Sequence, residues 1–198
     1  MAKDLLTLPD DLPVPLDDGL CSHLAGTDVG ECLLPATNGQ LIDISQSSTP
    51  RTVVFAYPRT GRPGESSPGG DDFWNAIPGA RGCTPEVCRF RDIHAELEQE
   101  GATVYGLSLQ STAYQKEMTE RLHVPFAILS DEGLQLTRAL RLPTFTVDGL
   151  LLLRRFTLVL EGPRIRHVFY PVFPTTTHAD EVLEWLRAHP LSESTRQK

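Results

Sequence analysis

The sequence lacks the features that mark membrane, secreted and nucleic-acid-binding proteins. No apolar run approaches the roughly 20 residues that a membrane-spanning helix needs. Residues 1–30 are acidic and proline-dotted, without the basic start and apolar stretch of a signal peptide. Lys and Arg number 18 against 26 Asp and Glu, so the formal net charge is −8. This charge argues against nucleic acid or an anionic membrane as the main partner. A cytoplasmic protein is expected.

Metal-ligand patterns are also missing. A structural zinc site needs four ligands, commonly with two cysteines separated by two to four residues and a second pair elsewhere. Here Cys83 and Cys88 are separated by four residues, and Cys21 and Cys32 lie far upstream in unrelated contexts. The six histidines form no H-x3–5-H pair. We therefore expect no metal and no cofactor, which leaves buried structural thiols or redox chemistry as readings of the cysteines.

The length of 198 residues and the hydrophobic content of 40% suit one domain with a proper core. Residues 1–28 read as an irregular arm rich in Pro and Asp, residues 29–189 as the domain, and residues 190–198 as a flexible polar tail. From Arg59 the composition shifts to Gly, Pro, Ser and Asp, so residues 59–79 are predicted to be a long loop. Loops this long in compact domains tend to be functional or mobile.

Hydrophobic periodicity gives an alternating order of strands and helices. A hairpin is expected around Asn38-Gly39. The order predicts an α/β fold of the thioredoxin type, a central mixed sheet with helices on both faces. The predicted strands are 52–57, 104–109, 126–129, 144–147, 150–160 and 164–170, and the predicted helices are 85–100, one starting at Thr112, 131–140 and one capped by Thr177 that ends at 188.

The most informative segment is Gly82-Cys83-Thr84-Pro85-Glu86-Val87-Cys88-Arg89-Phe90-Arg91-Asp92. Thr84 is expected to cap a helix, with Pro85 at its first position. Cys83 would then lie at the positive end of the helix dipole, which favours thiolate over thiol. A thiolate is both a nucleophile and the species that peroxides oxidise. The segment therefore predicts a reactive cysteine with a second thiol five residues on.

These residues resemble the peroxiredoxins, specifically the Prx Q or bacterioferritin comigratory protein group. Other stretches that carry the resemblance are Val53 to Pro58, Val104 to Ser108, Ile128 to Asp131 and Arg155 to Val159. The resemblance covers roughly residues 28–188 and implies a thioredoxin-like fold. It also implies a thiol-dependent peroxidase that reduces hydrogen peroxide and organic hydroperoxides and acts as a monomer.

The resemblance assigns roles by position. Cys83 matches the peroxidatic cysteine and Cys88 the resolving cysteine, with a Cys83–Cys88 disulfide that thioredoxin or a similar dithiol protein would reduce. Pro58 matches the proline of the active-site motif, and Arg155 the arginine beside the thiolate. Arg154 is an alternative one residue out of register, which alternation along a strand would point to the opposite face. Cys21 and Cys32 have no adjacent basic residue and are expected to be unreactive.

The sequence departs from the family motif between its proline and its cysteine. The motif calls for seven residues, whereas Pro58 and Cys83 are 25 apart, and position 80 is Ala instead of Thr or Ser. Thr60 is our first choice for the missing hydroxyl. The loop 59–79 could shape the substrate opening or a partner surface, or be a tolerated insertion. Trp74 within it could cover an apolar opening or anchor the loop to the body of the protein.

Two other function classes fit the same fold. A thiol–disulfide oxidoreductase would normally use a C-x-x-C motif, and the four-residue gap here disfavours it. A peroxide-sensing switch would use the same disulfide to regulate a partner. Steady turnover of peroxide, rather than one stoichiometric oxidation, separates a peroxidase from a sensor.

Overall fold

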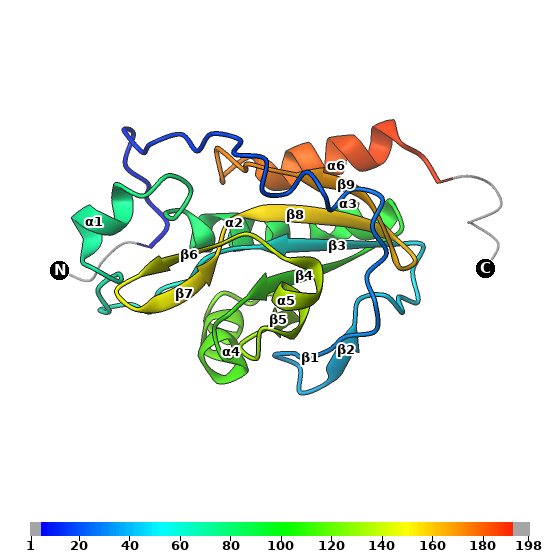
Figure 1. The fold of residues 1–198 in the computed structure, drawn as a ribbon, viewed down its shortest axis with the longest axis horizontal. Coiled ribbons are helices and arrows are strands. Elements are labelled where there is room, and N and C mark those ends of the chain that lie inside the picture. The colour runs from blue at the N-terminus through cyan, green and yellow to red at the C-terminus, as the bar shows by residue number, and fades with distance from the viewer. Residues whose placement is uncertain (1–4, 192–198) are drawn as a thin grey trace.

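The structure is a computed structural model that describes residues 5–191. A sheet of five strands forms the centre of the molecule (Figure 1). The central strand is β3, which is parallel to β4 and antiparallel to β8. The sheet is therefore mixed, and the predicted fold class is confirmed. In sheet order the strands are β5 (Ile128–Ser130), β4 (Ala102–Ser108), β3 (Arg51–Ala56), β8 (Phe156–Glu161) and β9 (Arg164–Phe169).

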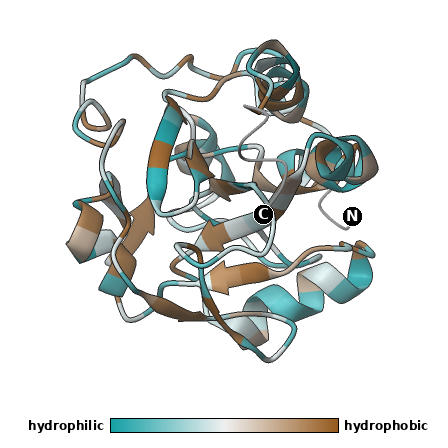
Figure 2. Ribbon diagram, turned by 90° about the vertical axis from the view of Figure 1, so that its right-hand side faces the viewer, coloured by the Kyte–Doolittle hydropathy of each residue, from teal (hydrophilic) through white to brown (hydrophobic). Residues whose placement is uncertain are grey.

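Alternation along β3 builds a hydrophobic core on each face of the sheet. Val53 and Phe55 belong to one core and Val54 and Ala56 to the other. In Figure 2 the inner strands are coloured mostly hydrophobic, whereas the surrounding helices mix both colours. The core that contains Val53 and Phe55 is covered by four helices: α2 (Cys83–Asp92), α3 (His94–Gln99), α4 (Thr112–Arg121) and α6 (His178–Ala188). The second core, which contains Val54 and Ala56, is covered by α5 (Gln135–Leu140), by the hairpin of β1 (Leu33–Pro35) and β2 (Leu41–Asp43), and by the N-terminal arm.

The arm has no helix or regular strand over residues 5–28, apart from a bridge between Asp28 and Arg164. It is nevertheless attached to the domain, because Cys21 and Leu24 are buried in the second core. The Asn38-Gly39 hairpin is confirmed by the antiparallel pairing of β1 and β2. Most of the predicted tail, residues 192–198, lies outside the described residues. Among residues 5–191, no helix is both long and apolar enough to cross a bilayer.

The prediction of one continuous strand over residues 150–160 is wrong, because this segment forms two strands that belong to two different sheets. β7 (Leu150–Leu153) pairs with β6 (Thr144–Val147) in a hairpin that projects from the main sheet, and only β8 joins β3 (Figure 1). Arg154 and Arg155 form the junction between the two strands. This break matters for the site, since strand alternation does not set the direction of Arg155.

Helix boundaries also differ from the sequence-based predictions. The predicted helix 85–100 is interrupted at Ile93, which leaves the helical region with φ −111° and ψ 17°. The cap of α4 is the Ser111 hydroxyl, which accepts a bond from Tyr114 N, and not Thr112. The predicted helix 131–140 begins only at Gln135, because the Asp131 carboxylate bonds backbone N–H groups of the first turn. Thr177 does precede α6, but without a side-chain cap bond.

Candidate active site

The N-terminus of α2 lies at the carboxyl end of the sheet and begins at Cys83. Its cap is Gly82, with φ 106°, and not Thr84 as predicted. Glycine is required there because a Cβ would lie 2.3 Å from the Thr175 hydroxyl oxygen. Thr84 and Pro85 are buried within the first turn, where backbone N–H groups have no helical partner, so the missing N–H of proline costs no hydrogen bond. The helix thus starts two residues earlier than predicted, directly at Cys83.

Cys83 is buried, 3% exposed, and two groups contact its sulfur. The Arg155 guanidinium donates from Nη2 to Cys83 Sγ at 3.1 Å, and the Ala80 carbonyl oxygen lies 3.5 Å from the same atom. Arg155 also donates to the carbonyl oxygens of Gly79, Ala80 and Arg81, at 3.3, 3.4 and 3.4 Å. The chain just before α2 therefore wraps the guanidinium and fixes it beside the sulfur.

Glu86 completes this arrangement, and the sequence reasoning gave it no role. Its carboxylate pairs with Arg155 Nη1, and both side chains are almost fully buried. Burial raises the pKa of Glu86, while the Arg155 charge opposes that rise. Glu86 lies three residues after Cys83 in the first turns of α2, so an acidic residue at that spacing was the signal available in the sequence. One carboxylate thus holds the arginine that contacts the thiol.

The two candidate arginines lie in different surroundings. Arg155 is buried beside Cys83, whereas Arg154 is partly exposed, with Nη2 3.8 Å from Asp18 Oδ2 and its guanidinium 6.0 Å from the Phe145 ring. The structure therefore brings Arg155, and not Arg154, to the thiol.

Cys88 lies in the same helix and its thiol is free, as is that of Cys83. Burial raises the pKa of the Cys88 thiol, while the neighbouring charges of Arg91 and Arg121 act in the opposite direction. Five residues of α-helix place two Cα atoms roughly 8–9 Å apart, and a disulfide needs them within about 7 Å. The two sulfurs cannot bond while this part of α2 stays helical.

Pro58 and Thr60 follow β3 at the edge where α2 begins. Pro58 is buried, and its carbonyl oxygen accepts a bond from the Ser108 hydroxyl at 3.2 Å. Thr60 is fully buried and lines the cavity over Cys83, but its hydroxyl donates to Gln110 Oε1 at 3.2 Å. Gln110 also receives the Thr60 N–H at 2.9 Å. Thr60 thus lies in the site, with its hydroxyl bonded to Gln110 and not to the thiol.

The long segment 59–79 is not wholly a loop, because it contains the short helix α1 (Asp71–Asn75). Two aspartates in its first turn suit the helix dipole, and Trp74 is buried. Trp74 packs with Ala80 and with the β6–β7 hairpin, its ring centroid 6.5 Å from that of Phe145. It also lines the cavity over Cys83. Trp74 therefore anchors the segment to the body of the protein, and the opening that it lines is polar and not apolar.

The cavity over Cys83 is small and has a polar lining, with about 30 Å³ of space. A larger apolar cavity of about 300 Å³ lies behind Arg155, and its lining does not include Cys83. A buried nucleophilic thiol, a fixed guanidinium and a helix N-terminus can together stabilise negative charge that develops on an oxygen bound in this small space. This is the chemistry of attack on a polarised bond by a thiolate.

Comparisons with known proteins agree with this chemistry. Residues 24–183 match the Redoxin family model. The chain is 27% identical over 172 residues to peroxiredoxin Bcp of Escherichia coli K12, covering 83% of this chain and 96% of that protein. It is 24% identical over 191 residues to a chloroplastic peroxiredoxin Q of Gentiana triflora, covering 94% and 79%. The crystal structure of peroxidoxin BcpB from Mycobacterium tuberculosis superposes with a TM-score of 0.66 at 25% identity, covering 84% and 98%.

The fold and the family match define the class: the chain belongs to the redoxin family. Within that family it falls in the peroxiredoxin Q and bacterioferritin comigratory protein group, and its activity is that of a thiol-dependent peroxidase.

Proposed function

We propose that Cys83 is the peroxidatic cysteine, Cys88 the resolving cysteine and Arg155 the group that activates attack. The Cys83 thiolate attacks one oxygen of the peroxide, the O–O bond breaks, and an S–O bond forms. The leaving oxygen takes a proton and departs as water or an alcohol, so Cys83 becomes a sulfenic acid. The observation that carries this assignment is the 3.1 Å contact between Arg155 Nη2 and Cys83 Sγ at the start of α2.

The supporting residues have separate tasks in this proposal. Arg155 stabilises charge on the departing oxygen, and Glu86 positions Arg155. Pro58 places the chain as it leaves β3. Thr60 lines the space over the sulfur, and its role as the hydroxyl that replaces the motif Thr or Ser stays a prediction.

The second step requires part of α2 to unwind. The Cys88 thiol attacks the Cys83 sulfenic sulfur, an S–S bond forms, and water leaves. The second half of α2 is anchored, since the ring of Phe90 stacks on Phe55 at 4.1 Å and Arg91 donates to the Leu122 carbonyl oxygen at 2.8 Å. We therefore place the unwinding in residues 83–88 and expect the end of α2 to stay in place.

Recycling needs a dithiol reductant such as thioredoxin, which reduces the disulfide by thiol exchange. A bacterioferritin comigratory protein of Xanthomonas campestris, 21% identical to this chain, has alkyl peroxide reduction activity. We propose two substrate classes here, hydrogen peroxide and organic hydroperoxides. A cytoplasmic monomer in which residues 29–189 form the catalytic domain completes the proposal, and it needs no metal or organic cofactor.

Steady turnover is the experiment that separates this enzyme from a redox sensor or a thiol–disulfide oxidoreductase. The protein is mixed with hydrogen peroxide, thioredoxin, thioredoxin reductase and NADPH, and NADPH oxidation is followed. Continuous oxidation over many equivalents of peroxide supports the proposal. The Cys88→Ser variant should consume one equivalent and leave a sulfenic acid at Cys83 that a sulfenate probe traps. No probe adduct in that variant would remove Cys88 from the role of resolving cysteine.

A further inference from the structure

Residues 59–68, here called the flap, form one wall of the cavity over Cys83. Seven of them line it, namely Arg59, Thr60, Gly61, Glu65, Ser66, Ser67 and Pro68. These residues belong to the segment between Pro58 and Cys83, which is longer in this chain than in the active-site motif of the family. Leu5 of the arm lines the same cavity and packs near Gly61. The flap therefore lies between the thiol and solvent.

The flap is firmly held at its second residue, Thr60. Thr60 donates its N–H and its hydroxyl to Gln110 Oε1, and Gln110 Nε2 donates back to the Thr60 carbonyl oxygen at 3.1 Å. All of these groups are buried. The flap ends at Gly69 and Gly70, whose positive φ angles of 72° and 91° are accessible to glycine. If the flap moves, the backbone is therefore expected to bend at Gly69 and Gly70 and not at Thr60.

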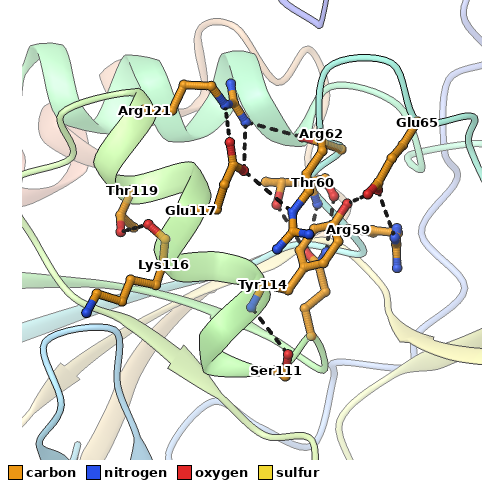
Figure 3. Close-up of polar contacts among 12 residues, drawn as sticks. Arg59, Thr60, Arg62, Glu65, Ser111, Tyr114, Lys116, Glu117, Thr119 and Arg121 are labelled. Carbon is orange, nitrogen blue, oxygen red and sulfur yellow. Dashed lines mark hydrogen bonds and ion pairs between the residues drawn. The ribbon is translucent and has the colours of Figure 1, made fainter.

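Tyr114 of α4 holds the outer part of the flap (Figure 3). Two guanidinium groups lie over its ring, that of Arg59 at 4.7 Å and that of Arg62 at 4.1 Å from the ring centroid. Its hydroxyl donates to Glu65 Oε2 at 2.5 Å. One side chain from the body of the protein thus contacts three residues of the flap.

A second contact joins the flap to the same helix. Arg121 of α4 donates to Glu117 Oε1 at 2.7 Å and to the Gly61 carbonyl oxygen at 3.4 Å, and Arg62 Nε lies 3.7 Å from Glu117 Oε2. These ion pairs are partly exposed, so each is weak on its own. The flap is held by several modest contacts that can be released together.

The closed flap leaves little space over the sulfur. The cavity of about 30 Å³ compares with the roughly 10–15 Å³ that one water occupies by the same measure. A molecule of the size of hydrogen peroxide fits beside the sulfur, whereas the phenyl and methyl groups of cumene hydroperoxide would have to lie at the mouth of this cavity, against the flap. The closed flap is therefore expected to hinder a bulky peroxide.

We infer that the flap is a size filter on the peroxidase site and that Tyr114 is the residue that keeps it closed. Closed protein reacts with hydrogen peroxide, and only the open fraction reacts with a bulky hydroperoxide. This inference rests on the proposed role of Cys83 and narrows its substrates: hydrogen peroxide is preferred, and organic hydroperoxides react in proportion to flap opening. Tyr114 acts as a specificity residue without contact with the reacting atoms.

The test compares two rate constants in wild type and in Tyr114→Ala. Cys83 oxidation by hydrogen peroxide and by cumene hydroperoxide is followed by rapid alkylation quench and mass spectrometry. Two cation–π contacts and a hydrogen bond together shift an opening equilibrium by about tenfold. Tyr114→Ala should therefore raise the cumene hydroperoxide rate constant by about tenfold and leave that for hydrogen peroxide unchanged. Tyr114→Phe, which keeps an aromatic ring beside both arginines, should change the ratio less.

Lys116→Ala is the matched control, because Lys116 is on the same helix but points away from the flap, and it should leave both rates unchanged (Figure 3). Arg62→Gln changes an exposed flap contact without removing a core side chain and should shift the ratio in the same direction. Equal changes for both peroxides, or a wild type that does not discriminate between them, would overturn the filter alone. If Cys83 reacts with neither peroxide faster than free cysteine, the proposed function fails and the filter fails with it.

Discussion

The cysteines of α2 and the two upstream cysteines are all buried, but the charges around them differ. Burial raises the pKa of the Cys21 thiol to about 12, and Asp18 and Asp17 add to the rise. Cys32 has its pKa raised by burial and then by Asp131 and Asp43. Carboxylates beside both thiols disfavour the thiolate, which is the reactive form.

Arginines lie near both thiols of the α2 pair, although Asp92 adds to the rise in the pKa of Cys88. Arg155 contacts the sulfur of Cys83, and Arg91 and Arg121 oppose the effect of burial at Cys88. All four thiols are buried, so a neighbouring arginine is what distinguishes the candidates for chemistry. The following predictions test that distinction.

Cys83→Ser should abolish peroxidase activity, because a serine hydroxyl is not appreciably ionised at neutral pH and cannot replace the thiolate. NADPH oxidation in the thioredoxin-coupled assay measures the loss. The Cys21→Ser/Cys32→Ser double variant is the comparison, and it should keep full activity. Comparable activity in Cys83→Ser would place the chemistry at another residue.

Arg155→Ala should slow peroxide attack by roughly 10²-fold, as expected for losing one donor to a developing oxyanion. The rate constant for Cys83 oxidation is the measurement. Removing Arg155 also leaves Glu86 buried without its partner, at a cost of about 3–5 kcal/mol, so circular dichroism must first show that the variant is folded. Arg154→Ala should change the rate little, and the reverse ranking would contradict the site described here.

Formation of the disulfide should change amide exchange in only part of α2. In the oxidised protein, exchange at Glu86 to Cys88 should become faster by roughly tenfold or more, because the first turns have unwound. Exchange at Arg91 and Asp92 should change little, since this end is anchored. Hydrogen exchange of both redox forms, followed by NMR, measures this. Unchanged protection in protein proven to carry the 83–88 bond would refute the unwinding step.

The smallest effect is expected at the upstream pair. Relative to an ordinary thiol pKa of 9.0, the raised pKa of Cys21 gives about a thousandfold less thiolate at pH 8. Iodoacetamide should therefore label Cys21 far more slowly in folded than in denatured protein, and mass spectrometry of labelled peptides measures both states. Because a raised pKa moves ionisation to higher pH, labelling of Cys21 should rise only in strongly alkaline solution. Equal labelling of the two states at pH 8 would show that the surroundings of Cys21 do not decide its reactivity.

The sequence predicted those features that local pattern determines. The buried strand around Phe55 and the hairpin at Asn38-Gly39 followed from periodicity and turn chemistry. It also placed Cys83 at a helix start, although the capping residue was wrong. Gly82 takes that position because Thr175, distant in sequence, leaves no room for a side chain. A local pattern cannot report such a contact.

Tertiary contacts account for what the sequence did not reveal. Glu86 looked like an ordinary acidic residue of the first turn, and only the fold brings it to Arg155. The split of the predicted strand 150–160 depends on β7 finding a partner in β6 and not in the main sheet. The flap could not be seen either, because its link to Tyr114 spans some fifty residues of chain. The Arg155 assignment came from the resemblance and not from periodicity.

Disulfide mapping is the most direct test of the central claim that charge, and not burial, selects the reactive pair. The reduced protein is treated with one equivalent of hydrogen peroxide, alkylated, digested and analysed by mass spectrometry. The account predicts one new linkage, between Cys83 and Cys88, with Cys21 and Cys32 recovered as alkylated thiols. A Cys21–Cys32 linkage, or oxidation at Cys88 while Cys83 stays a free thiol, would contradict it.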